Sequence, residues 1–114
     1  GGLEAASLLL AAARRPTAMI CCNDVVAFGA MLGLERQGVV IGRDIAVTGV
    51  GDVPEASTSR PPLTTLETGP RRIGQEAARL LLRRIADPAA TPEQVILPAR
   101  LVIRASCGPP PGVA

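Results

Sequence analysis

The sequence predicts an α/β fold in which a mostly parallel sheet is flanked by helices. Two short segments, residues 18–22 and 45–50, have the charge-free composition of buried strands, and an uncharged helical segment lies between them. A strand, a helix and a second strand in this length form a βαβ unit, whose strands are parallel. A third strand and a long amphipathic helix follow, which continues the alternation.

The first half of the chain contains the predicted βαβ unit. Residues 3–13 are rich in Ala and Leu, which favour a helix, and a proline soon afterwards ends it. Residues 18–22 are expected to form a strand that is buried on both faces. Asp24 is a suitable N-cap for a helix over residues 25–37, and Gly38 is the expected stop at its C-terminus.

The second half begins with a segment of turn residues, 51–62, followed by a third strand over residues 63–67. Pro70 fits the first turn of a long helix, where its missing N–H is not needed. Apolar positions of this helix follow one i+4 row, which is the stripe of an amphipathic helix. The row consists of Ile73, Ala77, Leu81 and Ile85.

The C-terminal part predicts two more strands. The dipeptide at residues 87–88, Asp-Pro, ends the long helix, and residues 95–97 and 101–103 have strand composition. Pro98 separates these segments and breaks any continuous ladder. From Cys107 onward, the Gly- and Pro-rich sequence predicts a disordered tail.

The composition limits the chemistry that this chain can perform. It has 114 residues, no His, one aromatic residue (Phe28), and 12 basic residues, all Arg, against 10 acidic ones. The absence of His removes the usual general base and the commonest metal ligand. Neither a G-x-S-x-G elbow nor a Gly-rich phosphate loop is present. The sequence therefore predicts a protein that is not an enzyme and that holds no cofactor or metal.

Charge and cysteine usage exclude other classes. The net charge is only +2, with both signs mixed, which gives no basic field for nucleic acid or membrane. No apolar segment reaches the roughly 20 residues that span a bilayer. The three cysteines, Cys21, Cys22 and Cys107, include an adjacent pair and lack metal-ligand spacing, so we expect structural, buried thiols and a reducing compartment.

The helical segment over residues 25–34 carries no charge. A surface helix normally shows a polar face, so this one is expected to be covered on both sides. One cover is the sheet. The other is either more of the same domain or a second subunit, and Gly29 and Gly33 would let a neighbouring backbone come close.

Polar residues follow the first two predicted strands. Because ligands of open α/β sheets bind at the carboxyl ends of the strands, Asn23 and Asp52 are candidate contacts. Asn23 can donate and accept hydrogen bonds, or it can be a turn residue that bonds its own backbone. Asp52 is open to the same two interpretations. For Asp24, the role of helix cap is favoured over ligand contact.

Arginines of the long helix lie opposite its apolar row. Arg72, Arg79 and Arg83 are near one face, and a solvated surface explains them better than an anion site does.

Several segments, in this order, resemble the LacI/GalR family of transcriptional regulators. Residues 16–24 read Pro-Thr-Ala-Met-Ile-Cys-Cys-Asn-Asp, which is similar to that family's P-T-A-x-x-x-x-N-D. Residues 44–49, Asp-Ile-Ala-Val-Thr-Gly, resemble its D-[IV]-[SA]-V-[VI]-G. Residues 61–66, Pro-Pro-Leu-Thr-Thr-Leu, match its P-P-L-T-T-[VI], and residues 97–104 resemble its closing L-P-x-x-L-V-x-R.

The resemblance implies a periplasmic-binding-protein-like fold of type I, with an effector held between two lobes. Residues 1–67 would belong to the C-terminal lobe and residues 68–98 would supply a helix and a strand of the N-terminal lobe. Residues 99–106 would return to the C-terminal lobe, and residues 107–114 would be the tail. The chain would thus contain only part of the effector-binding domain.

The resemblance also implies function and partners. The chain would sense a sugar-like small molecule for a cytoplasmic DNA-binding regulator, and lobe closure would control transcription. Asn23 falls on the family's ligand-contacting Asn. The helix that follows would form a homodimer interface through Val26, Phe28, Ala30 and Met31. DNA would be bound only through a helix-turn-helix domain that these residues do not include, and no membrane is involved.

Two adjacent positions depart from the family pattern. Val50 stands where the family usually has an aromatic residue. Gly51 stands where the family has its effector-binding acid, and Asp52 stands at the next position, which is treated as structural. Loss of a buried acceptor for sugar hydroxyls would cost about 1–3 kcal/mol. The site therefore serves another ligand or is degenerate.

Two other functions fit the predicted fold. An extracytoplasmic sugar-binding protein of an uptake system would share it. A small doubly wound hydrolase is the third candidate, but the absence of His and of a phosphate loop argues against it.

Overall fold

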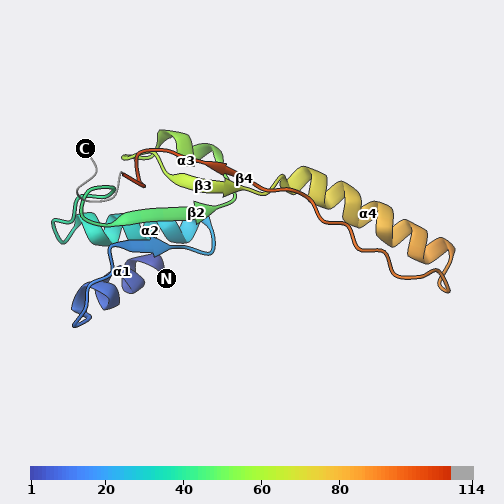
Figure 1. Ribbon diagram of the computed structural model, residues 1–114, viewed down its shortest axis with the longest axis horizontal. Helices are drawn as coiled ribbons and strands as arrows, with labels where there is room; N and C mark the ends of the chain where they lie inside the picture. The colour runs from blue at the N-terminus through green and yellow to red at the C-terminus, as the bar shows by residue number, and fades with distance from the viewer. Residues whose placement is uncertain (109–114) are drawn as a thin grey trace.

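The computed structural model describes residues 1–108, which form a compact body and a projecting arm (Figure 1). Within these residues one four-stranded sheet has the order β1-β2-β3-β4. Strands β1 (Ala18–Ile20), β2 (Ala46–Val50) and β3 (Thr64–Glu67) are parallel, and β4 (Arg100–Val102) is antiparallel to β3. The predicted α/β fold with a mostly parallel sheet is confirmed. The tail predicted over residues 107–114 lies outside the described residues from position 109.

Two helices pack against each other on one side of the sheet. They are α1 (Gly2–Ala11) and α2 (Asp24–Glu35), and α2 also packs on β2. A Cβ added at Gly33 would lie 2.8 Å from the Ala6 Cβ and 3.0 Å from the Leu3 carbonyl oxygen, so this approach depends on glycine. On its glycine side, α2 is therefore covered by α1 of the same chain.

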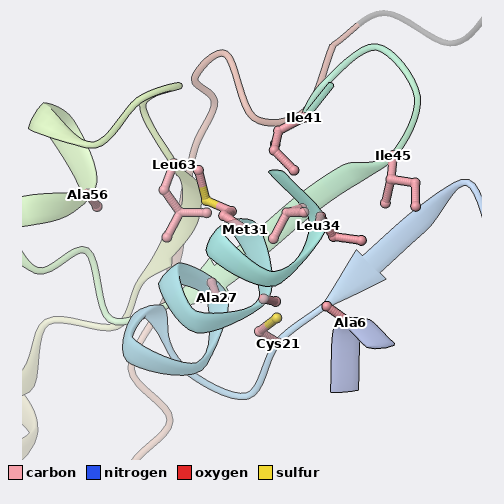
Figure 2. Packing of buried hydrophobic residues seen from close by; sticks show 11 residues of the cluster. Ala6, Cys21, Ala27, Met31, Leu34, Ile41, Ile45, Ala56 and Leu63 are labelled. Carbon is pink, nitrogen blue, oxygen red and sulfur yellow. The ribbon is translucent and has the colours of Figure 1, made fainter. Parts of the chain in front are cut away.

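The core lies between α2 and the sheet and reaches to α1 and to the segment before β3 (Figure 2). It consists of Ala6, Cys21, Ala27, Ala30, Met31, Leu34, Ile41, Ile45, Val47, Ala56 and Leu63. Leu34 and Leu63 are fully buried, and truncating such a side chain to Ala typically costs 2–5 kcal/mol. Phe28 packs against this core but is only partly buried, so the core is aliphatic, as the composition requires.

Two predictions for the body are wrong. Strand β1 is not buried on both faces, because it is the edge strand of the sheet and Ile20 is 86% exposed. The segment 51–62 is not only a turn, since it contains the short helix α3 (Pro54–Thr58). Pro54 is the first residue of α3. Its ring fixes φ near the helical value, and the backbone N–H that it lacks would have no partner in the first turn of a helix.

The arm consists of α4 (Pro70–Ala86) and a returning segment that runs beside it (Figure 1). Pro70 begins the helix, as predicted. Residues 95–97 were expected to form a strand, but they do not, because no strand lies next to them among the described residues. The returning segment is held instead by Glu93, whose carboxylate accepts from Arg79 Nη2 at 2.9 Å and from Arg83 Nη1 at 2.6 Å.

No described residue of α4 is buried, and its apolar row faces solvent. Leu81 is 60% exposed and Ile85 is 66% exposed, as is the neighbouring Leu82. Residues 1–108 thus leave this row exposed. An exposed apolar row of this kind favours association with other surfaces.

We expect the isolated chain to self-associate beyond a dimer through α4. The double substitution Leu81→Glu and Ile85→Glu should lower its mass in solution, as measured by light scattering. The melting temperature of the body should stay within a few degrees, because α4 contributes nothing to the core. A wild-type chain that is no larger than a dimer at all concentrations would contradict this expectation.

Candidate functional site

The candidate site lies at the carboxyl edge of the parallel strands. Asn23 follows β1, and Gly51 and Asp52 follow β2. The arm leaves and returns at this same edge, because Glu67 at the end of β3 pairs with Arg100 at the start of β4. Open α/β sheets bind ligands at such an edge, so the fold brings the sequence-predicted residues to one region.

Asn23, and not Asp24, is the N-cap of α2. The Asn23 Oδ1 accepts a hydrogen bond from the Val26 backbone N–H at 2.8 Å. The prediction of Asp24 as the cap is therefore wrong. Both residue types cap helices well, and the fold places the first of the two in the capping position. Asn23 is exposed, so its cap role leaves its amide nitrogen free at the edge.

Asp24 instead points into the protein and is only 1% exposed. Its Oδ1 accepts from the Thr65 hydroxyl at 2.5 Å, and its Oδ2 accepts from the Val53 N–H at 2.9 Å. These bonds join the start of α2 to β3 and to the loop after β2. Residue 49 must be small here, because a Cβ on Gly49 would lie 2.3 Å from the Asp24 Oδ1.

The loop after β2 has an unusual backbone. Gly51 has φ of 132°, a conformation that residues with a side chain rarely adopt, and Asp52 has φ of 51°. The Gly51 N–H donates to the Leu66 carbonyl at 2.8 Å, which ties the loop to β3. An acidic residue at position 51 would thus require a different loop backbone.

Asp52 is engaged inside the chain. Its Oδ1 lies 2.7 Å from Arg104 Nη2, without the angles of a hydrogen bond, and both side chains are 19% exposed. Its N–H donates weakly to the Thr65 hydroxyl at 3.4 Å. These contacts favour a structural role for Asp52. A ligand contact for either Asn23 or Asp52 stays a prediction.

A second polar cluster, which the sequence did not indicate, joins β2 and β3 to the segment after β4. Ser106 is fully buried, donates to the Val47 carbonyl at 2.6 Å and accepts from the Thr64 N–H at 2.7 Å. Arg104 donates through Nη1 to the Leu63 carbonyl at 2.8 Å. The paired threonines in the predicted third strand were the available signal, since buried hydroxyls need partners.

The cysteines differ in their surroundings. All three are free, Cys21 is buried and Cys107 is half-buried, but Cys22 is exposed beside Asn23, so the prediction of buried thiols is wrong for Cys22. Burial raises the pKa of the Cys21 thiol, and the neighbouring Cys22 raises it further.

The residues predicted for a dimer interface are divided between two environments. Ala30 and Met31 are buried within the chain, whereas Val26 and Phe28 are half-buried. A hollow lies between α2 and α3. It is lined by Phe28, Met31, Leu32, Glu35, Glu55, Thr58, Ser59 and Arg60. The interface itself stays a prediction.

Two further observations concern residues 1–108. No three of their Cys, Asp and Glu side chains are grouped so that they could hold a metal ion. None of the helices in that part of the chain is long and apolar enough to cross a membrane.

We predict that Asp24→Ala lowers the free energy of unfolding by about 2–4 kcal/mol, because it leaves the Thr65 hydroxyl and the Val53 N–H without their acceptor. Asp24→Asn is the matched control. Its amide oxygen can accept from Val53 and its nitrogen can donate to Thr65, so its loss should be clearly smaller. Urea denaturation measures both, and equal losses would contradict the proposed anchoring.

Comparison with known proteins identifies the fold. The family model of the periplasmic binding protein-like domain matches residues 2–107. The HTH-type transcriptional repressor PurR of Mannheimia succiniciproducens is 40% identical over 105 residues, which are 92% of this chain and 31% of that repressor. This chain thus spans about a third of the length of such relatives.

Solved structures of transcriptional regulators have a similar fold. A LacI family transcriptional regulator from Enterococcus faecium with bound ribose has a TM-score of 0.82 and 35% identity, over 96% of this chain and 40% of that one. The lac repressor dimer bound to operator and an anti-inducer has a TM-score of 0.83 and 33% identity, over 95% of this chain and 32% of that one. The chain therefore belongs to the periplasmic binding protein-like domain family, in the form found in LacI-family transcriptional regulators.

Proposed function

We propose that this chain is the effector-sensing part of a LacI-type transcriptional regulator. In this proposal residues 1–67 and 99–106 belong to the C-terminal lobe, and the arm, residues 68–98, belongs to the N-terminal lobe. A small molecule binds between the lobes, and their closure changes the geometry of a DNA-binding domain outside these residues. Relatives that are regulators, one of them with bound ribose, support this role over that of an uptake protein.

One observation carries the proposal: the candidate site and both ends of the arm lie at the same edge of the sheet. Glu67 and Arg100, where the arm leaves and returns, lie at the same end of the sheet as Asn23 and Gly51. A ligand at this edge would contact the body and whatever lobe the arm belongs to. Its binding energy would then depend on the angle between them, which is what a closure mechanism requires.

A homodimer would use the outer side of α2. Leu32 is 44% exposed beside the half-buried Phe28, in the hollow that α3 completes. The lac repressor relative is a dimer bound to its operator, which supports this choice of partner. In this proposal the protein works by binding and not by catalysis, and it acts in the cytoplasm, where DNA is available.

Ligand binding to the native chain should raise its melting temperature, because a ligand that binds only the folded state stabilises it by about 2.7 kcal/mol at a concentration of 100 Kd. Ribose, ribose 5-phosphate and adenine are suitable probes for differential scanning fluorimetry. Operator-length DNA is the control and should give no gel shift with these 114 residues. If no small molecule changes the melt, sensing by this chain is contradicted.

The dimer can be tested in the Leu81→Glu and Ile85→Glu background. There, Leu32→Glu should convert a dimer to a monomer, because it adds a charge to an apolar contact beside Glu35 and Glu55. Leu8→Glu is the control, since Leu8 is an apolar residue on α1 that is more exposed than Leu32 (70% against 44%), and it should leave the mass unchanged. Sedimentation velocity separates the outcomes, and a dimer that survives Leu32→Glu would place the interface elsewhere.

A further inference from the structure

The hollow between α2 and α3 combines apolar surface with charged residues. Phe28 and Leu32 supply apolar surface, and Glu35, Glu55 and Arg60 line the same hollow. The three charged residues are exposed. In the described part of the chain, no ion pair includes any of them. Their charges are therefore available to a partner.

Two contacts fix the direction in which α3 runs along α2. The N–H of Val53, which precedes α3, donates to Asp24 at the start of α2 at 2.9 Å. Pro61, which lies beyond α3, lines another hollow together with Glu35, the last residue of α2. The chain therefore passes from the start of α2 to its end between residues 53 and 61.

The two charges of this segment consequently lie at opposite ends of the hollow. Glu55 is in the first turn of α3, near the start of α2, and Arg60 is beside Pro61, near the end of α2. In a two-fold dimer the same surface meets itself, and an axis through the middle of the hollow exchanges its two ends. Arg60 of one copy would then lie against Glu55 of the partner subunit, and the reverse pair would form at the other end.

We propose that a second copy of this chain occupies the hollow and that Arg60 of each copy pairs with Glu55 of the partner subunit. This inference rests on the proposed homodimer and adds the residues that select the partner and set its orientation. A uniformly acidic or basic partner would be repelled at one end of the hollow, whereas a second copy is matched at both. Complementary charges at an interface mainly exclude wrong partners and fix the register, while the apolar contact of Phe28 and Leu32 contributes affinity.

Charge reversal tests the pair in the Leu81→Glu and Ile85→Glu background, which removes association through α4. Glu55→Arg and Arg60→Glu should each raise the dissociation constant of the dimer about 10-fold or more, because each brings like charges together twice. An equimolar mixture of the two variants should regain the dimer. In the mixed dimer one pair is native and the other is its reversed form, so both pairs have opposite charges. Sedimentation equilibrium measures the dissociation constants.

Glu35→Arg is the matched control. Glu35 lies at the same end of the hollow as Arg60, so in the dimer it faces the partner's Glu55 and not the partner's Arg60. The same reversal of charge at this position should not weaken the dimer. All three positions are exposed, so melting temperatures should stay within a few degrees. If a reversal unfolds the chain, Glu55→Gln and Arg60→Gln replace it, and each should raise the dissociation constant about 3-fold.

The outcomes separate the inference from the proposed dimer. If the dimer survives both reversals, or if the mixture fails to restore it, the inference is wrong while the homodimer stands. A Glu35→Arg variant that weakens the dimer as much as Glu55→Arg also overturns the inference, because the effect would then be one of overall charge. If the background chain is monomeric at every concentration, the homodimer and the inference both fail.

Discussion

The buried carboxylate of Asp24 fastens together the parts of the body that form the candidate site. Its two oxygens hold the Thr65 hydroxyl on β3 and the Val53 N–H in the loop after β2, while its backbone begins α2. An isolated buried charge is costly, but one that accepts hydrogen bonds through both oxygens is compensated. This arrangement explains why Asn23 is free to face the edge: the acidic neighbour, which could also have capped the helix, is needed inside.

Thr65 connects this anchor to the second acidic residue of the site. Its hydroxyl donates to Asp24 and accepts from the Asp52 N–H, and Asp52 in turn lies against Arg104 just beyond β4. The chain returns from the arm through β4, so the polar contacts run from the site toward the crossing segments. Small glycines at positions 49 and 51 leave room and backbone freedom for these contacts. The site is therefore rigid on the side of the body, and its polar groups are determined more by the fold than by the ligand.

Much of the fold could be predicted from the sequence, and the misses have physical causes. The βαβ order and the start of α4 at Pro70 follow from local composition. The choice between Asn23 and Asp24 as the cap does not, because both residues favour that position and the deciding partner, Thr65, is 41 residues away in sequence. Helix α3 has only five residues, too few to show a helical period. Residues 95–97 have strand composition, but a strand requires a neighbour, which a local pattern cannot supply.

The two crossings between body and arm lie side by side. Glu67 and Arg100 face each other in the antiparallel ladder, and their side chains form an ion pair with Nη2 at 2.6 Å from Oε2. Two adjacent strands make a ribbon that flexes across its thin direction more easily than within its plane. Bending of the arm at this point would favour one axis, along which the Glu67–Arg100 ion pair can stay intact. The longest dimension of the molecule, along body and arm, is 57 Å. A small change of angle where the arm joins the body would therefore displace the far end of the arm by a much larger distance.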